Sequence, residues 1–307
     1  GLSVNGGTPV TTTSDANGSF NFGGDVFLAA GDKVLVYANN AAYQANLAGS
    51  VLEAANLTDL ALANGQVMVG SPSTTNLSTS YSTADLAAAK GSLTTHIYYS
   101  VTGNALTVNN ASLTVPAGIT FAPGGAMTLA RDLNVAGDLT LSGATAVGRD
   151  LNLTGGSIVQ NANLSVGDDY VQTGGTFLDA SPLSHTFTVE DSFSVPFGTD
   201  EFRRYTGSGT ANDPFIIRNI YDLQAVKSNL TSHFRLSDDL LNGVLNASAA
   251  ADWNDNAGFD PIGDLGHAFT GSLNGNGKVI SNLEIDRAGT DYLGLFGNIG
   301  ASGSISN

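Results

Sequence analysis

The residues with the clearest potential for chemistry are three aspartates, Asp132, Asp150 and Asp168, which recur at a constant interval along the chain. If one interval is one turn of a stacked fold, the carboxylates would lie above one another. Such a row could bind a hard cation such as Ca²⁺ or supply paired carboxylates for polysaccharide cleavage. We favour turn residues that accept hydrogen bonds from nearby backbone N–H groups, because Arg131 and Arg149 would stack beside them and balance much of the charge.

A second group of carboxylates surrounds the single tryptophan. Asp252, Asp255 and Asp260 lie close to Trp253 in a stretch that interrupts the surrounding pattern. Oxygen ligands in a loop suit Ca²⁺, and an exposed Trp253 would suit stacking on a sugar ring. The spacing matches no defined calcium loop, so we favour a solvated acidic loop beside an aromatic ring packed on the core. The sequence leaves open whether either acidic group binds Ca²⁺.

Motifs for catalysis are absent from the sequence. It contains no G-x-S-x-G, no H-E-x-x-H and no EF-hand loop. Gly271 to Lys278 has the glycines of a phosphate loop at the wrong spacing, and Val279 replaces the required Ser or Thr. The histidines share no metal-ligand spacing and are treated as ordinary surface residues: His96, His185, His233 and His267. We therefore expect no enzyme, and we assign no catalytic, cofactor-binding or metal-binding residue.

The composition narrows the classes of protein further. The 307 residues include no cysteine and carry 27 acidic against 11 basic side chains, for a formal charge of −16. The lack of cysteine excludes disulfide scaffolds and thiol enzymes, and the charge would repel nucleic acid and anionic lipid. Abundant Gly, Ser, Thr and Asn with few charged residues is typical of a β-rich secreted protein. No apolar run is long enough to insert in a membrane.

The elements that would position these side chains follow from a repeat. The run Arg131 to Val135 recurs after one interval as the run Arg149 to Leu153. A finer period of six divides each interval into three, with aliphatic residues at Leu129, Val135, Leu141, Val147, Leu153 and Val159, and glycines at Gly125, Gly137, Gly143, Gly155 and Gly167. Three short strands per turn, each pairing in parallel with its equivalent one turn away, would make a β-solenoid over residues 104–197. The alternative is a meander of hairpins with regularly spaced glycines.

The segment before this repeat has a different character. Residues 1–40 contain short alternating runs divided by turn residues, and they resemble part of a bacterial Ig-like or carboxypeptidase-regulatory-like β-sandwich repeat. Residues 41–103 are expected to be a connector or a cap of the solenoid. Within them, Ala-rich stretches at 45–62 and 82–90 tolerate a helix, and Ser82 to Asp85 could begin one.

The final third carries a second resemblance. Five motifs follow one another: Pro261-Ile262-Gly263, Phe269-Thr270-Gly271, Leu273-Asn274-Gly275-Asn276-Gly277, Ile280-Ser281-Asn282-Leu283 and Gly294-Leu295-Phe296-Gly297. In this order they resemble the GLUG-motif repeats of bacterial surface proteins, over residues 205–307. The resemblance implies a right-handed parallel β-helix at 198–307 that continues beyond Asn307. Gly275 and Gly277 permit a tight corner, and Ile280, Leu283 and Ile285 would point inward.

These patterns together predict an all-β protein: a fragment of a large extracellular bacterial surface protein. We expect an adhesin, a stalk or a component of a filament or matrix, without catalysis. Its expected partners are cell-surface glycans or neighbouring copies of itself, including end-to-end association through an open strand edge. The alternative is a carbohydrate-active β-helix enzyme, a polysaccharide lyase or hydrolase, or the carbohydrate-binding part of one.

Overall fold

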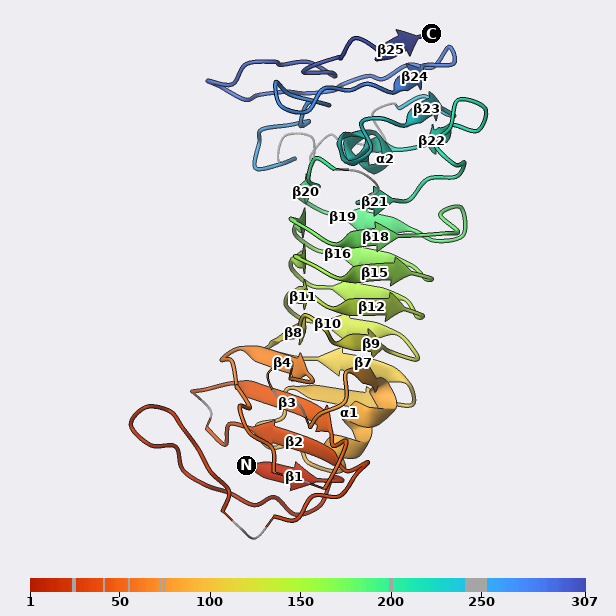
Figure 1. Ribbon diagram of the computed structural model, residues 1–307. Coiled ribbons are helices and arrows are strands. Elements are labelled where there is room, and N and C mark those ends of the chain that lie inside the picture. Colours follow the sequence, from red (N-terminus) through yellow and green to blue (C-terminus); the bar gives the residue numbers. More distant parts are fainter. Residues whose placement is uncertain are drawn as a thin grey trace.

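The computed structural model describes residues 1–23, 26–40, 42–54, 56–71, 73, 76–198, 201–240 and 253–307. These residues form a column of short β-strands stacked along one axis, with the two termini at opposite ends (Figure 1). The column is an all-β solenoid of about nine turns in the described part of the chain.

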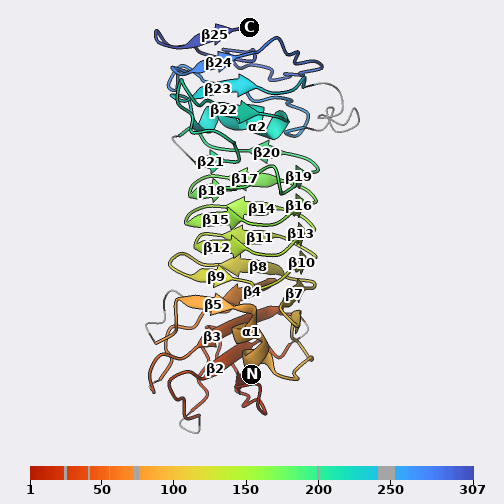
Figure 2. The same cartoon turned by 90° about the vertical axis from the view of Figure 1, so that its right-hand side faces the viewer.

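Three sheets run along the column, and the strands of neighbouring turns lie above one another (Figure 2). Sheet 1 contains, in spatial order, β1 (Leu2–Val4), β2 (Lys33–Tyr37), β3 (Ala45–Ser50), β4 (Gln66–Val69), β8 (Ser112–Val115), β11 (Leu133–Val135), β14 (Leu151–Leu153), β17 (Tyr170–Gln172) and β20 (Phe193–Ser194). Sheet 2 contains β6 (Tyr99–Thr102), β7 (Ala105–Val108), β10 (Met127–Leu129), β13 (Thr145–Val147), β16 (Leu164–Val166) and β19 (Phe187–Val189). Sheet 3 contains β5 (Ser80–Ser82), β9 (Thr120–Ala122), β12 (Asp138–Leu141), β15 (Ser157–Gln160), β18 (Thr176–Leu178) and β21 (Phe202–Arg203).

The remaining elements lie at the two ends. Helix α1 (Thr83–Lys90) belongs to the N-terminal end, and the helix α2 (Ile220–Gln224) continues directly into a 3₁₀ turn (Ala225–Ser228). Sheet 4 forms the C-terminal end from β22 (Phe215–Ile217), β23 (His233–Leu236), β24 (Ser272–Asn274) and β25 (Ser304–Ser306), all paired in parallel.

Strand β11 shows why these residues form a turn of the coil. Its three residues alternate, so Leu133 and Val135 are buried while Asn134 points outward. Parallel pairing with β14 places Leu133 on Leu151 and Asn134 on Asn152. The Asn152 side-chain amide donates to the Asn134 side-chain oxygen at 3.1 Å. Successive turns therefore bury one continuous core that no single turn could bury alone.

The predicted period holds for one turn and then lengthens. Leu133 pairs with Leu151, one period away, whereas Leu151 pairs with Tyr170, one residue beyond the next repeat. The extra residue lies between β14 and β15, where Gly156 has a φ of 57°. A Cβ at this position would lie 2.0 Å from the carbonyl oxygen of Gly137 in the neighbouring turn. Only glycine fits this close approach in a left-handed conformation.

The extra residue shifts the inward-facing positions by one. The aliphatic residues of the predicted period are buried from Leu129 to Leu153. Val159 was expected to continue the series, but Ile158 and Gln160 are the buried residues of β15 and Val159 is only half-buried. Because neighbouring side chains of a strand point to opposite faces, one inserted residue is enough to exchange them.

The first residues of the chain extend sheet 1. β1 pairs antiparallel with β2, β2 antiparallel with β3, and β3 parallel with β4. The Ig-like sandwich expected for residues 1–40 is not shown, because the described strands of this segment belong to the same sheet as the solenoid. Both faces of β2 are covered, which explains its sandwich-like pattern. Leu35 and Tyr37 face the main core, and Val34 and Val36 face a smaller second core.

Helix α1 lies at the N-terminal end of the column (Figure 2). It begins after Ser82, whose backbone N–H donates to the Asp85 carboxylate at 2.8 Å, as the sequence predicted. Leu86 and Ala89 of the helix are buried in the main core. Of the other Ala-rich stretch, residues 45–50 are strand β3 instead of a helix, because pairing on both sides outweighs the helix propensity of alanine.

The final third continues as a parallel coil, as the resemblance implied. Isolated parallel bridges join Ile262 to Phe296 and Phe269 to Ile299 between successive turns, and the rings of Phe269 and Phe296 are 5.0 Å apart. A corner is present here, but the positive φ values lie at Asn276 and Gly277 and not at Gly275. Ile280, Leu283 and Ile285 pack against the main core and are partly buried.

Candidate functional site

One corner of the column collects the polar residues that precede the strands of sheet 1. Asp132, Asp150, Asp169 and Ser192 each stand immediately before the first residue of a strand, and Ser112 is itself the first residue of β8. Backbone hydrogen bonds connect the stack: the N–H groups that follow Asp132 and Asp150 donate to the carbonyl oxygens of Asp150 and Asp169, both at 2.8 Å. We call Asp132, Asp150, Asp168 and Asp169 the acidic corner.

The sequence placed Asp168 in this stack, and the structure places Asp169 there instead. Leu151 pairs with Tyr170, so the residue before Tyr170 is the structural equivalent of Asp150. The cause is the residue inserted at Gly156, which makes this turn one residue longer than the turn before it. Asp168 lies beside the stack, and its carboxylate still comes close to those of Asp150 and Asp169.

Part of the charge in the acidic corner is balanced by hydrogen bonds and one arginine. Arg149 lies 3.7 Å from an Asp132 oxygen and 3.8 Å from an Asp150 oxygen. The Ser112 hydroxyl donates to Asp132 at 3.0 Å, and the Ser192 N–H donates to Asp169 at 3.0 Å. Bonds of this kind are those expected of turn residues that accept from local backbone and hydroxyl groups.

The acidic corner also has the composition of a site for a hard cation. Carboxylate oxygens of Asp150, Asp168 and Asp169 lie within 4.8 Å of one another, and all three side chains are half-buried. Burial raises the pKa of Asp150 above its ordinary value, and the negative charges of Asp132 and Asp168 add to the increase. Three oxygens at this separation suit Ca²⁺ in chemical type, and Arg149 would compete with the ion for the carboxylate of Asp150.

The second acidic group does not form a site among the described residues. Trp253 is 5% exposed and packs 5.6 Å from Tyr221 and 6.4 Å from Phe193, so it belongs to the core and cannot stack on a sugar. Asp260 pairs with Lys227 and lies 3.5 Å from Arg287. Asp255 has a φ of 55° in a turn, and Asp252 lies outside the described residues.

The histidines remain apart. His185 contacts Asp179, His233 contacts Ser272 and His267 contacts Asp264, at 2.7 to 3.0 Å. His96 has a positive φ in the turn before β6. Within the described ranges, no group of three potential metal ligands includes a histidine.

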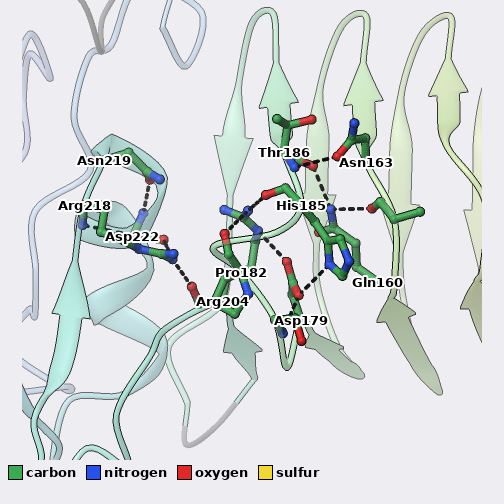
Figure 3. A network of polar contacts seen from close by, with 12 residues as sticks. Gln160, Asn163, Asp179, Pro182, His185, Thr186, Arg204, Arg218, Asn219 and Asp222 are labelled. Carbon is green, nitrogen blue, oxygen red and sulfur yellow. Dashed lines mark hydrogen bonds and ion pairs between the residues drawn. The ribbon is translucent and has the colours of Figure 1, made fainter.

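Sequence reasoning missed a network of buried charges at the joint between β18 and β22 (Figure 3). The buried carboxylate of Asp179 accepts from Arg204 at 3.3 Å and lies 3.0 Å from His185 Nδ1. Arg204 also donates to the carbonyl oxygen of His185 at 2.7 Å. Arg218 donates to Asp222 at 3.0 Å and to the carbonyl oxygen of Arg204. The network lies where the three sheets of the regular turns end and sheet 4 begins.

The electrostatics of this network match a structural role. Burial raises the pKa of Asp222 to about 6, although Arg218 and Arg204 oppose the increase. Burial likewise lowers the pKa of Arg204 from its ordinary value. One signal for part of the network was present in the sequence: Arg218 and Asp222 are four residues apart across the start of a helix, where Asn219 accepts from the Asp222 N–H at 2.9 Å.

Comparison with known proteins gives two relatives. The chain is 40% identical over 146 residues to a protein named halomucin from Haloquadratum walsbyi, a match of 46% of this chain and 2% of that protein. It is 36% identical over 104 residues to a protein described as a putative Gly-rich membrane protein from Evansella cellulosilytica, a match of 33% of this chain and 11% of that protein. The chain thus spans a small share of either relative.

The other comparisons are negative. No family model matches the chain, so the GLUG resemblance remains a resemblance, and no solved structure matches it. Across the described residues, no helix has the length and apolar character needed to cross a membrane.

Proposed function

We propose that this chain is part of an extracellular surface protein and serves as its stalk or spacer, without catalysis, in an adhesin or a surface matrix. The observation that carries the proposal is the uninterrupted core of the column, which runs from β2 to β24. A core that grows by adding turns gives length in one direction, which is the property a spacer needs.

The outer surface of the regular turns supports this function. In sheet 2 the outward residue at the centre of each strand from β7 to β19 is small and uncharged: Thr107, Thr128, Ala146, Ser165 and Thr188. Side chains of this size and polarity suit a solvated outer surface. The strong negative charge of the whole chain also favours a solvated, extended particle.

The names of the relatives agree with this role. One relative is described as a membrane protein and the other is named halomucin, and both are far longer than the matched region. A matched region that is a small part of a much longer protein is what a spacer segment would look like. These names support a place at the cell surface.

Labelling of intact cells tests the location. An antibody against this chain should stain unpermeabilised cells of the organism that encodes it, and external protease should remove the stain. Staining that requires permeabilisation would contradict the proposal. A cytosolic protein stained in parallel reports whether the cells are intact.

Incubation with labelled polysaccharides tests the alternative of a carbohydrate-active enzyme. The protein is mixed with a panel of fluorescent polysaccharides and Ca²⁺, because the acidic corner is the place where a cation and several carboxylates could act together. Size-exclusion chromatography then follows the label. We expect no glycan to elute later. Later elution would mean cleavage, and the function without catalysis would be wrong.

A further inference from the structure

The outer face of the cap formed by β1 to β3 is apolar and needs a cover. Val34 and Val36 of β2 and Leu47 of β3 are fully buried although they face away from the main core. The cover consists of the segments that precede β2 and follow β3, residues 5–32 and 51–65, whose described residues form no helix or strand. Figure 1 shows the first of these segments as a long red loop beside the strands.

These loops do not fill the space that they cover. Two cavities, of about 840 and about 800 Å³, lie between the loops and sheet 1. Phe20, Phe22 and Leu60 line both cavities, which therefore adjoin along this apolar wall. Each has the size of a typical small-molecule site, roughly 300 to 1,000 Å³.

The lining combines aromatic rings with neutral hydrogen-bonding groups. Phe20 and Phe22 form an edge-to-face pair with centroids 5.7 Å apart, and Tyr43 lines the second cavity. Side-chain amides, such as those of Asn21 and Asn39, line the same spaces. An amide can both donate and accept, as pairs of sugar hydroxyls require, and an aromatic ring suits the apolar face of a sugar.

Charge limits the class of ligand further. Among the described residues that line the two cavities, Asp59 is the one charged side chain. An acidic ligand would be repelled by Asp59 and by a chain of formal charge −16. A purely apolar ligand would leave the amides and hydroxyls of the lining without partners, which costs binding free energy. A neutral, hydroxyl-rich ligand avoids both penalties.

The loops are fixed at several points, so the cavities are formed before a ligand enters. Asp15 accepts from the N–H groups of Asn17 and Ser19, both at 2.9 Å, and closes the turn that precedes Phe20. Asp32 accepts from the Ala29 N–H at 2.8 Å at the other end of the loop. In the second loop, the carbonyl oxygen of Leu62 accepts from the Tyr43 hydroxyl at 2.8 Å. A preformed site loses less entropy on binding.

We propose that these adjoining cavities are a binding site for a neutral oligosaccharide. The sugar rings lie against Phe20 and Phe22, and the amides of Asn21 and Asn39 bind their hydroxyls. This binding site rests on the proposed stalk function, because a stalk at the cell surface would use the site to hold a ligand. The site is at the cap, away from the acidic corner and the regular turns.

Binding of defined oligosaccharides to the whole chain tests this site. The probes are the uncharged cellohexaose, maltohexaose and N-acetylchitohexaose, with oligogalacturonate as the acidic comparison and N-phenyl-1-naphthylamine as the apolar comparison. Saturation-transfer NMR detects binding down to millimolar affinity. The variants are Asn39→Ala, which is exposed and leaves the packing intact, and Phe22→Ala. Thr128→Ala on sheet 2 is the matched control, and circular dichroism verifies the fold of each variant.

We expect at least one neutral oligosaccharide to bind and both cap variants to weaken it by about tenfold or more, with Thr128→Ala unchanged. The proposal is overturned if no neutral probe binds, if the cap variants bind as well as the wild type, or if only the acidic or the apolar probe binds. None of these results changes the outcome of the cell-labelling experiment, so the site can fail while the stalk function stands.

Discussion

Asp150 lies at the centre of the acidic corner, where the negative charges of Asp132 and Asp168 both act on it. The sequence led to the right corner because a five-residue run recurs with its aspartate in the same place. It named Asp168 instead of Asp169 because two aspartates stand next to each other where the period changes. Composition and spacing can therefore locate such a stack of residues, but not its register across an inserted residue.

Removal of the charge at Asp168 should stabilise the protein. In Asp168→Asn one of the negative charges that raise the pKa of Asp150 is gone, so we expect an increase in stability of about 0.5 kcal/mol at low ionic strength. Thermal unfolding measures the effect, and salt should reduce it. Glu53→Gln removes the same charge from the exposed cap and serves as the control. Equal shifts in both variants would mean that only net charge matters.

The buried Asp222 should make stability depend on pH. Its pKa is raised from 3.8 to about 6 in the folded protein by burial. The folded protein therefore binds a proton that the unfolded chain releases, and this contribution is fully present below about pH 4 and is lost as the pH rises through about 6. It amounts to about 3 kcal/mol.

Urea unfolding at about pH 7 and about pH 4.5 measures this contribution. Asp222→Asn cannot titrate, so the gain in unfolding free energy on acidification should be smaller in the variant than in the wild type. Asp213→Asn changes an exposed aspartate and should keep the wild-type dependence. An identical dependence in the wild type and Asp222→Asn would show that Asp222 does not titrate in this range.

The turn between β14 and β15 decides the register of everything that follows. Gly156 is possible there because it has a positive φ and no Cβ to meet the Gly137 carbonyl oxygen. Gly156→Ala should cost about 3 kcal/mol or more, since strain and a clash add. Gly103→Ala, with a φ of 59° but open space around it, should cost only about 1 kcal/mol. Chemical denaturation compares the two, and similar costs would mean that the neighbouring turn yields easily.

Periodicity was enough to predict the regular turns, but not the cap or the joint. The six-residue aliphatic pattern identified the strands of the solenoid up to Leu153, because an inward side chain must recur at each strand. Residues 1–40, which contain β1 and β2, looked like a separate module because the pairing that joins them to the solenoid runs through β3 and β4, outside that segment. The buried charges of Asp179 and Arg204 likewise depend on a contact across 25 residues, which no local pattern encodes.

The two ends of the described column differ. The N-terminal end is covered by α1 and the antiparallel strands, whereas Ile305 of β25 is 47% exposed at the other end and residues 292–307 carry no charged side chain. We propose that two copies of this 307-residue chain associate through this surface when it is studied by itself, because an open strand edge without charge favours pairing. Sedimentation velocity should show dimers that Ile305→Asp abolishes. A wild-type chain that stays monomeric at high concentration would contradict the proposal.

Strands that lie across the column have a mechanical consequence. The hydrogen bonds between turns run along the long axis, so tension between the two ends would open them one turn at a time. Each turn of about 18 residues adds only about 5 Å to the folded column but about 60 Å of extended chain once released. When single molecules are stretched, the end-to-end length should therefore increase in small steps, each of about the length of one released turn. Such a molecule would hold its length at rest and lengthen gradually under load, so that the opening of turns limits the force that a sudden pull places on either attachment.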